Sequence, residues 1–379
     1  MPPTEAALLS AADLAPFAEA WDALAARAIE PNVFLSRWLA GARLRHLPDG
    51  TGARCLVAFR GEGASRQLVG LSLLTPSRGR RFNPLPVLRA VDLYAPLSTP
   101  LIAPERPVET WSAMLACLGR AGIAALALPE LAATGPVAQA LREAAAGMGL
   151  PLAGLGEHRR AMLSSPLSGS DYLKATLDRR RRHEADRQRR RLAEQGRLEL
   201  VVASVSDGVG AALDGFLALE AVGWKGRAGT DLATAPGGAA YFRAGAEGAP
   251  KGAFRVVSLL LDGRPIAAGI VLVAGRRAFY VKTAYDETQA RFSPGLLLTL
   301  DLTRHLLDDP GIDDADSVAD ADHPMIDRVW TERMAIESVL VGLSAGRGLA
   351  FRAALAAEQA REGAIRTARA ALAALKRRG

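Results

Sequence analysis

The feature that most constrains the fold is a pattern that occurs twice, about 200 residues apart. Residues 55–59 (CLVAF) and 67–74 (QLVGLSLL) are apolar runs on either side of a polar turn that contains glycine. Residues 254–261 (FRVVSLLL) and 265–273 (PIAAGIVLV) repeat this arrangement around the turn DGRP, and a third run follows at 278–285. Each copy predicts antiparallel strands. The repetition favours a tandem duplication, although a hairpin alone is a common device.

Segments with helical periodicity flank both copies. In these segments apolar residues recur three and four positions apart. The predicted helices lie at 10–28, 33–47, 111–118, 136–147 and 294–307, and further strands at 123–128, 315–318 and 335–341. This mixture of strands and helices predicts an α/β protein.

Size and composition agree with two globular domains. The 379 residues are 49% hydrophobic, which provides enough apolar surface for a buried core and excludes general disorder. Two cysteines, Cys55 and Cys117, are too few for a disulfide-rich scaffold or a cysteine metal cluster. No apolar run predicts a membrane span and residues 1–14 lack a secretory pattern, so we expect a soluble, cytoplasmic protein.

The net charge of +7 is concentrated in two segments. Residues 179–191 hold eight Arg against two acids, a local +6, and residues 366–378 hold four Arg and one Lys, a local +5. The rest of the chain therefore carries −4. The body of the protein is mildly acidic, and the basic character belongs to two predicted helices.

The first basic segment predicts a long helix with one narrow apolar seam. The seam consists of Leu173, Leu177, Ala185 and Leu192. No aromatic residue lies between residues 174 and 200, so the segment lacks the stacking platform that nucleic-acid binding favours. The helix is either a solvated connector or an electropositive wall that attracts the phosphates of a cofactor or of a nucleotide-sugar acceptor, with nucleic acid or a membrane as the remaining alternative.

Residues 285–300 (YDETQARFSPGLLLTL) predict a helix that opens directly after a strand. Ser293 is placed as the N-cap, Pro294 suits the first helical position and Gly295 leaves the backbone accessible. The unpaired N–H groups and the dipole of such a start favour a phosphate, and Arg291 adds a positive charge nearby. An ordinary capped helix explains the same residues.

Four short motifs carry a resemblance to a known family. They are GRPIAA at 263–268, AYD at 284–286, FSPG at 292–295 and DAD at 320–322, with Trp330 after them. The chain from 254 to 330 thereby resembles the GNAT acyltransferase superfamily, in particular its branch of cellulose-biosynthesis (CelD-like) acetyltransferases, which is related to the FemABX aminoacyl transferases. Looser similarity extends from about 161 to 341. The phosphate loop of ordinary GNAT enzymes, Q/R-x-x-G-x-G/A, is absent.

The resemblance implies an α/β fold of tandem GNAT-like domains, each a mixed, mostly antiparallel sheet flanked by helices. The expected divisions are an N-terminal GNAT-like domain at 1–165, a basic connecting helix at 166–197, a C-terminal GNAT acyltransferase domain at 198–345 and an Ala-rich helix at 346–379.

The resemblance also implies that the pyrophosphate of an acyl-CoA, expected to be acetyl-CoA as cosubstrate, meets the helix opened by the Ser-Pro-Gly corner. The residues predicted to bind this cofactor are Arg291, Phe292, Ser293, Pro294 and Gly295.

Acyl transfer from a thioester needs a neutral nucleophile, an N–H donor for the oxyanion and a proton for the leaving thiolate. We expect a backbone oxyanion donor. Glu220 is the first candidate for the general base, followed by Asp286 and Asp322, and Tyr285 is a candidate proton donor. A solvated helix carboxylate at Glu220 and a core-packing role for Tyr285 are the alternatives.

Four residues are predicted to bind the acceptor: Trp224, Lys225, Lys282 and Asp286. Glu220 and Trp224 are one helical turn apart and share a face, on a helix expected to end at Gly223 or Gly226. Lys225 either binds an acidic acceptor or caps the helix C-terminus.

The sequence gives little support for a metal site or for two other classes of catalytic motif. The run Asp320-Ala-Asp322-His323 contains ligand-type side chains, but isolated acidic turns are common and no metal is expected. Neither the G-x-S-x-G elbow nor the G-x-x-x-x-G-K-[ST] loop is present, so serine hydrolases and P-loop enzymes are not indicated.

The sequence therefore predicts an acyl-CoA-dependent N-acyltransferase acting on an amine or hydroxyl of a small molecule or nucleotide sugar. The resemblance places it in polysaccharide or cell-envelope precursor metabolism. The alternatives are a FemABX-type transferase that uses aminoacyl-tRNA, the one nucleic-acid partner expected, and a non-catalytic GNAT-like binding module. The C-terminal helix packs on its own domain or on a second chain, as in a homodimer.

Overall fold

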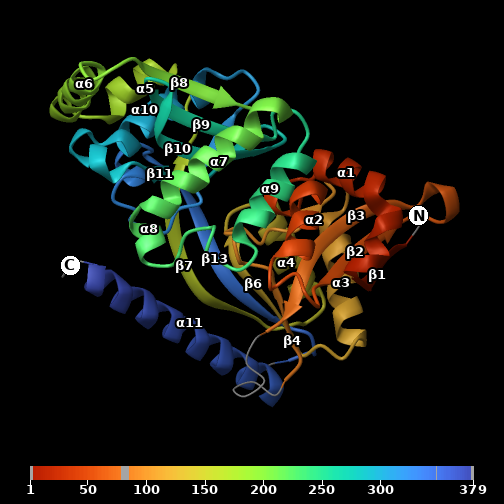
Figure 1. The fold of residues 1–379 in the computed structure, drawn as a ribbon. Helices are drawn as coiled ribbons and strands as arrows, with labels where there is room; N and C mark the ends of the chain where they lie inside the picture. Colours follow the sequence, from red (N-terminus) through yellow and green to blue (C-terminus); the bar gives the residue numbers. More distant parts are fainter. Residues whose placement is uncertain (1–2, 78–84, 347, 377–379) are drawn as a thin grey trace. The chain divides into compact units, whose positions relative to one another are not determined.

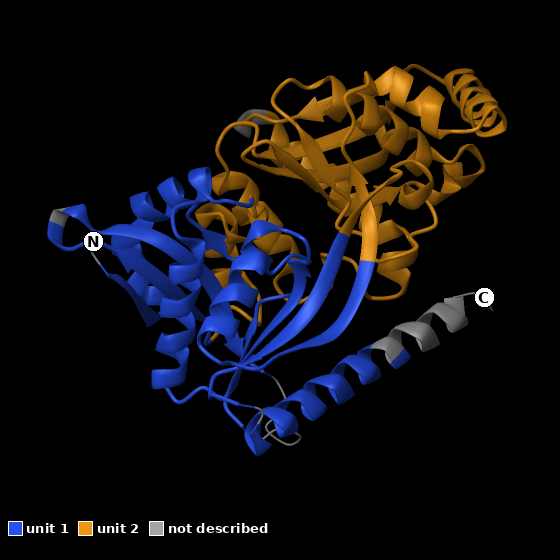
Figure 2. Cartoon of the chain, turned by 180° about the vertical axis from the view of Figure 1, so that it is seen from behind, with its two compact units in different colours: residues 1–30, 52–158, 335–379 blue, residues 31–51, 159–334 orange. Residues whose placement is uncertain are grey.

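The computed structural model describes residues 3–77, 85–346 and 348–376 (Figure 1). The chain forms two compact units, each assembled from segments that are distant in sequence (Figure 2). The first unit contains residues 1–30, 52–158 and 335–379, and the second contains residues 31–51 and 159–334. Residues 31–51, which the sequence places in the N-terminal domain, thus group with the second unit.

The first unit has a sheet with helices on it. In order across the sheet, its strands are β1 (Thr4–Ser10), β2 (Arg54–Arg60), β3 (Gln67–Pro76), β4 (Val87–Ala90), β6 (Ala125–Ala132) and β13 (Glu332–Gly342), with β5 (Leu101–Ile102) beside β3. Its helices are η1 (Ala11–Phe17), α1 (Ala18–Arg27), η3 (Gly63–Ser65), α3 (Pro107–Arg120), α4 (Pro136–Gly147) and α11 (Leu349–Lys376).

The second unit repeats this plan. In order, its strands are β8 (Leu198–Ala203), β9 (Phe254–Leu261), β10 (Arg264–Ala274), β11 (Arg277–Tyr285), β12 (Asp314–Asp316) and the end of β7 (Leu152–Leu163). Its helices are η2 (Val33–Leu35), α2 (Arg37–His46), α5 (Gly169–Thr176), α6 (Arg179–Ala193), α7 (Ser206–Val222), α8 (Trp224–Arg227), α9 (Gly238–Gly248), η4 (Glu287–Phe292), α10 (Pro294–Asp308) and η5 (Ile326–Arg328).

The two sheets have the same sequence of strand directions. In each unit the first four strands pair antiparallel, the fourth and fifth pair in parallel, and the sixth pairs antiparallel with the fifth. A helix precedes the fifth strand in both, α3 in the first unit and α10 in the second. The predicted fold class is confirmed: the chain is an α/β protein of tandem GNAT-like domains with mostly antiparallel sheets.

The sixth strand of each sheet comes from outside the consecutive run. In the first unit it is β13, which follows the whole second unit, and in the second unit it is the end of β7, which precedes that unit's other strands. Hydrophobic alternation predicts that a segment is a strand but not which distant strand it pairs with. The sequence prediction therefore could not assign the partner of β13. It also missed β7 entirely.

Most local elements lie where the sequence predicts them. The predicted meander matches β9, β10 and β11, and the helix predicted at 136–147 coincides with α4. Four further strands, β1, β4, β5 and β8, were missed. β1 (TEAALLS) is rich in Ala and Leu, which favour helices, and β8 is a half-exposed edge strand of only six residues.

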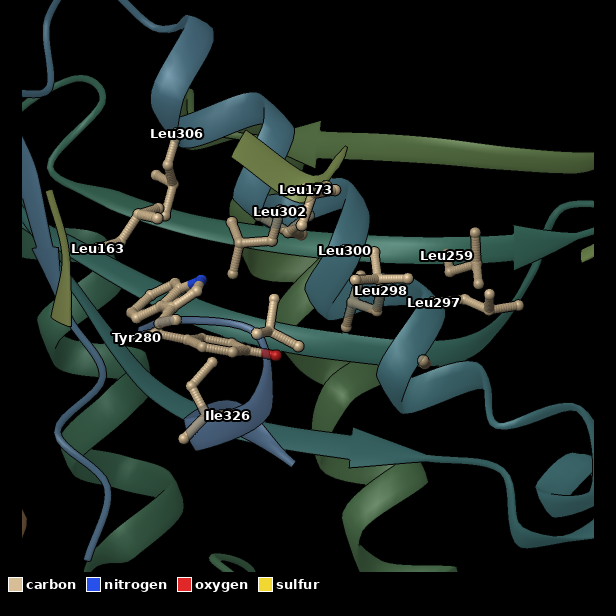
Figure 3. Close-up of a cluster of buried hydrophobic side chains, with 14 of the residues drawn as sticks. Leu163, Leu173, Leu259, Tyr280, Leu297, Leu298, Leu300, Leu302, Leu306 and Ile326 are labelled. Atoms are coloured by element: carbon tan, nitrogen blue, oxygen red, sulfur yellow. The ribbon is translucent and has the colours of Figure 1, made fainter. Parts of the chain in front are cut away.

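A leucine-rich core holds α10 on the sheet of the second unit. Figure 3 shows leucines of α10 pointing toward the strands, beside Tyr280 and Ile326. The indole N–H of Trp330 donates to Thr303 Oγ1 at 2.9 Å, which satisfies the buried polar edge of this large side chain. The four seam residues of the basic segment are buried in the same cluster, as predicted, but α5 and α6 are two helices rather than one.

The Ala-rich C-terminal segment forms α11. Phe351 and Ala354 on its first turns are buried in the first unit, and Glu358 is paired there with Arg89 at 3.1 Å. Part of the predicted basic cluster, Arg377 and Arg378, lies outside the described residues. Among the helices that the structure describes, none combines the length and apolar character needed to cross a bilayer.

Candidate functional site

The central feature of the second unit is a gap between two parallel strands. β12 pairs with β11 over only three residues, from Arg277↔Asp314 to Phe279↔Asp316. β11 continues to Tyr285, whereas the chain after β12 turns away. The edge of β11 from Tyr280 onward therefore lies beside no β12 residue, and an extended ligand can pair with it in the manner of an added strand.

The end of β12 is held in a strained conformation. Asp316 is fully buried, forms an ion pair with Arg160 and accepts the Val318 N–H at 2.9 Å. Val318 has φ 44°, a left-handed conformation that β-branched residues rarely adopt. The hydrogen bond from Val318 to Asp316 directs the chain away from β11. The strained residue is therefore part of the turn that opens the gap.

A β-bulge interrupts β11 inside the gap. Ile270 of β10 pairs with Lys282, but the next residue, Val271, pairs with Tyr280, so Val281 is the extra residue. Bulges re-aim backbone and side chains and are over-represented beside active sites. Here Tyr280 contacts Thr299 of α10, and Lys282 contacts Glu220 of α7.

Helix α10 begins at the same edge of the sheet, at Pro294 as predicted. Ser293 is the N-cap residue, as predicted, but it has φ 50° and its side chain makes no capping hydrogen bond. Pro294 has no N–H and Leu297 N–H bonds to Ser293 O. Among the described residues, the N–H groups of Gly295 and Leu296 are the pair left for a ligand.

Two other predicted site residues near this start are engaged locally. The Arg291 guanidinium stacks on the Phe292 ring at 4.6 Å, and Phe292 is buried. The Asp286 carboxylate accepts the Thr288 N–H at 2.9 Å and its hydroxyl at 2.7 Å, which caps η4. These contacts order the turn between β11 and α10.

Glu220 lies at the centre of a charged cluster on the other face of the sheet. Its Oε1 accepts Lys225 Nζ and Lys282 Nζ, both at 2.9 Å, and its Oε2 accepts the Leu232 N–H at 2.9 Å. The residue is 2% exposed. The alternative of a solvated helix carboxylate is therefore wrong.

The cluster favours an ionised Glu220. Burial opposes the charge, but the ammonium groups of Lys225 and Lys282 and the Leu232 N–H outweigh it, so the pKa of Glu220 lies below its ordinary value. Burial and the Lys225 ammonium together lower the pKa of Lys282, although Glu220 acts in the opposite direction. A carboxylate with a lowered pKa is a weaker base, and the role of Glu220 as general base stays a prediction.

Trp224 and Lys225 line a small hollow of about 30 Å³ together with Glu220. α7 ends at Val222, and Gly223 begins the short helix that carries Trp224, so the helix ends where predicted. Lys225 does not cap the helix, because its Nζ contacts Glu220 and Thr283 O. Trp224 is 41% exposed.

Tyr285 connects this hollow with the start of α10. It lines the hollow, and its ring lies 3.3 Å from the position that a Cβ on Gly295 would occupy. Asp322 lies instead in the exposed turn after β12, with φ 57°, and makes no hydrogen bond or ion pair with the described residues. The structure thus groups Glu220, Trp224, Lys225, Lys282 and Tyr285 and leaves Asp322 apart.

Comparison with known families agrees with this geometry. The family described as "Acetyltransferase (GNAT) domain" matches residues 179–324, from the first residue of α6 to the turn after β12. This range includes the gap, the bulge and the start of α10. Residues 179–324 are therefore similar to a GNAT domain, and we call this part of the chain the GNAT domain.

Solved structures support the fold of the whole chain around this GNAT domain. FemX aligns with 86% of this chain and 95% of its own, at 12% identity and a TM-score of 0.56. The C-terminal domain (DUF2156) of a putative lysylphosphatidylglycerol synthetase from Agrobacterium fabrum aligns with 92% and 96%, at 14% identity and a TM-score of 0.55. A conserved protein of unknown function from Bacteroides thetaiotaomicron aligns with 87% and 97%, at 11% identity and 0.53. A search of the curated proteins found no match.

The first unit repeats the GNAT topology, but its own chain fills the corresponding gap. The connection from β4 to α3, residues 91–106, is twice as long as the connection 286–293 in the GNAT domain. Ser98 N–H bonds to Glu130 O at 3.1 Å, and Ala132 N–H bonds to Thr99 Oγ1 at 3.3 Å, both on β6 beyond its pairing with β4. These residues are buried where the GNAT domain is open.

The helix that corresponds to α10 is also blocked by its own side chains. α3 begins at Pro107 after Arg106, which has φ 56°, like Ser293 before Pro294. The carboxylate of Glu109, in the first turn, contacts Arg106 Nη1 at 2.9 Å and Thr4 Oγ1 at 2.5 Å. An acidic group at this helix start disfavours a phosphate.

Several residues of the GNAT domain were missed from the sequence. Glu287 accepts the Trp224 N–H and the Arg227 guanidinium, and Val281 forms the bulge. Glu287 was missed because the acidic turn around it matches no sequence motif. Val281 was missed because the sequence of one strand does not show where a bulge will form. In the part of the chain that the structure describes, no three His, Cys, Asp or Glu side chains are grouped as metal ligands.

Proposed function

We propose that the GNAT domain transfers an acyl group, acetyl in the simplest case, from CoA to an amine or hydroxyl of a small acceptor. The observation that carries this proposal is the gap between β11 and β12, which ends at the start of α10. An extended thioester arm fits along the open edge of β11. Its phosphates then meet the Gly295 and Leu296 N–H groups and the helix dipole.

The chemistry follows from what surrounds the gap. The acceptor nitrogen or oxygen attacks the thioester carbonyl, the C–S bond breaks, and the thiolate takes a proton. Backbone N–H groups around the Val281 bulge are our candidates for stabilising the oxyanion, and Tyr285 for supplying the proton. The acceptor approaches from the hollow beside Trp224, where Lys225 and Lys282 orient it. Glu220 and Asp322 stay candidates for the base.

Two sequence motifs suggest the chemical class of the acceptor. The turn GRPIAA, which joins β9 to β10, and the FSPG corner resemble motifs of the CelD-like branch. We therefore place the acceptor among polysaccharide or cell-envelope precursors, such as a nucleotide sugar.

Calorimetry with CoA and acetyl-CoA, followed by thiol release across a panel of amine and sugar acceptors, tests the proposal. Gly295→Glu should abolish binding, because its side chain and charge occupy the phosphate position. The matched control, Gly295→Ala, meets only the Tyr285 ring and should change the Kd by no more than about 3-fold. Absence of CoA binding to the unaltered protein would refute the proposal, and binding without thiol release from any acceptor would favour the non-catalytic module.

A second candidate is transfer from aminoacyl-tRNA, since FemX shares the fold and α6 is strongly basic. Binding of tRNA that falls steeply between low and moderate salt would favour it. No binding of tRNA even at low salt would exclude it.

A further inference from the structure

The hollow beside Trp224 is too small to enclose a whole acceptor molecule. Its volume of about 30 Å³ equals the share of one water molecule in the liquid, so a single small group enters it. Glu220 and Lys225 line the hollow, and Trp224, which also lines it, is 41% exposed. An acceptor therefore places one polar group inside, and the exposed ring of Trp224 offers a surface for its remaining atoms.

Lys225 carries its ammonium group from the hollow to the open edge of β11. The Asp286 N–H donates to Ile266 O at 2.8 Å, so Asp286 faces β10. Because residues along an antiparallel strand direct their backbone groups alternately to one side and the other, Thr283 faces the gap instead. Lys225 Nζ donates to Thr283 O at 3.2 Å. The ammonium group thus lies at the edge where the thioester arm is expected.

The two ammonium groups of this cluster share one carboxylate. Lys225 Nζ and Lys282 Nζ both donate to Glu220 Oε1 at 2.9 Å. An ammonium group has three N–H bonds, and Glu220 and Thr283 are the two hydrogen-bond acceptors that Lys225 contacts among the described residues. Burial, and then the Lys225 ammonium, lower the pKa of Lys282, as expected where positive charge is in excess. An anionic group in the hollow completes the hydrogen bonds of Lys225 and offsets this excess.

The acidic side chains next to the cluster are engaged elsewhere. Glu287 lines the hollow, but its carboxylate accepts the Trp224 N–H and the Arg227 guanidinium. The Asp231 carboxylate accepts N–H and O–H groups of its own turn and does not line the hollow. Neither carboxylate contacts Lys225, so the hollow favours an anion over a cation.

The position of Thr283 limits how far this anion lies from the reacting atoms. Thr283 is two residues after Val281, whose bulge is our candidate for binding the oxyanion. Two residues of a strand span about 7 Å, and a nucleophile attacks a carbonyl from about 3 Å. An acceptor anchored at Lys225 therefore reaches the thioester carbonyl when its amine or hydroxyl is only a few bonds from its anionic group.

We propose that Lys225 binds a carboxylate of the acceptor, and that the GNAT domain acylates an amine or hydroxyl a few bonds from that carboxylate. Amino acids and sugar acids both carry this arrangement. A carboxylate suits the small hollow, whereas a phosphate is larger. This inference rests on the proposed function, because the thioester arm along β11 brings the acyl group beside Lys225.

Matched pairs of acceptors test the carboxylate. Thiol release from acetyl-CoA is measured with a panel of amino acids and uronic acids, each beside its neutral amide. The unaltered protein should prefer the carboxylate member of a reactive pair about 10-fold in kcat/KM, the effect of one hydrogen bond to a charged group. Lys225→Met should remove this preference. Comparing the same pair in both proteins cancels the different intrinsic reactivities of acid and amide, and the reactive pair shows whether the carboxylate belongs to an amino acid or to a sugar acid.

Two further variants control for charge and for folding. Lys225→Arg keeps the positive charge and should retain part of the preference. Lys251→Met is the matched control and should retain all of it, because Lys251 is exposed in the turn before β9 and does not line the hollow. A thermal melt and calorimetry with CoA check that each variant is folded. A preference that survives in Lys225→Met, or that Lys251→Met loses equally, would overturn the proposal.

Calorimetry of the full chain with the same acceptors separates this inference from the proposed function. Carboxylate binding that Lys225→Met weakens, without thiol release from any acyl-CoA, would keep the carboxylate site and reject the proposed function. Thiol release that treats acid and amide alike, or favours the amide, would keep the proposed function and reject the carboxylate site. Thiol release with amino-sugar phosphates alone, lost in Lys225→Met, would assign Lys225 to a phosphate and reject the carboxylate.

Discussion

Glu220 shows how a side chain acquires a role through its surroundings. Its position before Trp224 in the sequence predicts a base at the cleft, but in the structure it joins two lysines from α8 and β11. The lysine ammonium groups stabilise the charge of Glu220, and Glu220 keeps both lysines beside the hollow. We infer that its first contribution is to position Lys225 and Lys282.

Replacing Glu220 should destabilise the protein in a pH-dependent way. Glu220→Gln removes the buried carboxylate that the partly buried Lys225 and Lys282 share and should lower the free energy of unfolding by about 3 kcal/mol at pH 7. Because the folded-state pKa of Glu220 is lowered, this difference is complete above the ordinary value of 4.5 and disappears as the pH falls through the folded-state value. Urea denaturation across the pH range measures it.

Lys282→Met is the control for this prediction. The pKa of Lys282 is lowered, so its charge is disfavoured in the folded protein, and its removal should cost far less than that of Glu220. Equal losses from the two variants, or a loss from Glu220→Gln that does not change with pH, would show that the cluster acts through packing alone.

At the scale of elements, the gap depends on where β12 ends. Three paired residues followed by the turn at Val318 separate the chain from β11. In the first unit Glu130 also has a left-handed conformation, φ 51°, but it lies within β6, which continues to Ala132.

Relieving the strain at Val318 should stabilise the protein. Val318→Gly removes a β-branched side chain from a left-handed conformation and should raise the free energy of unfolding by about 1 kcal/mol. Asp322→Gly, the matched control with φ 57°, should gain less, because Asp tolerates this conformation better than Val. Thermal and urea unfolding measure both. A destabilised Val318→Gly would mean that the packing of the side chain outweighs its strain.

At the scale of the whole molecule, the two units share one strand order but differ at the gap. Residues 91–106 close it in the first unit through Ser98 and Thr99, and Glu109 places a carboxylate at the helix start. The first unit therefore keeps the strand order, while its own residues occupy the gap.

The protein should bind one CoA per chain. Calorimetry on the full chain should give a stoichiometry of one, and Gly295→Glu should reduce it to zero, because the first unit offers no open gap. A stoichiometry of two, or one site remaining in Gly295→Glu, would contradict the assignment of the first unit as a non-binding copy.

Local patterns in the sequence are enough for much of this description. The alternation in β9 to β11, the Pro294 start of α10 and the buried seam of Leu173, Leu177, Ala185 and Leu192 are each encoded within a few residues of one another. The resemblance adds the tandem GNAT-like fold. These predictions succeed because hydrogen bonding and burial within one helix or hairpin depend on neighbouring residues.

Contacts between distant segments account for the rest. Four features join residues that are far apart in the chain. They are the pairing of β13 with β6, the hydrogen bonds of Ser98 and Thr99 to β6, the lysines around Glu220 and the cavity between α6 and η5. A strand pattern does not name its partner, and a charged side chain does not reveal its counter-ion until the chain has folded. The overall charge of +7 becomes informative for the same reason: the fold brings Arg180 and Arg328 to one cavity beside the start of α10 and gives them no acidic partner among the described residues.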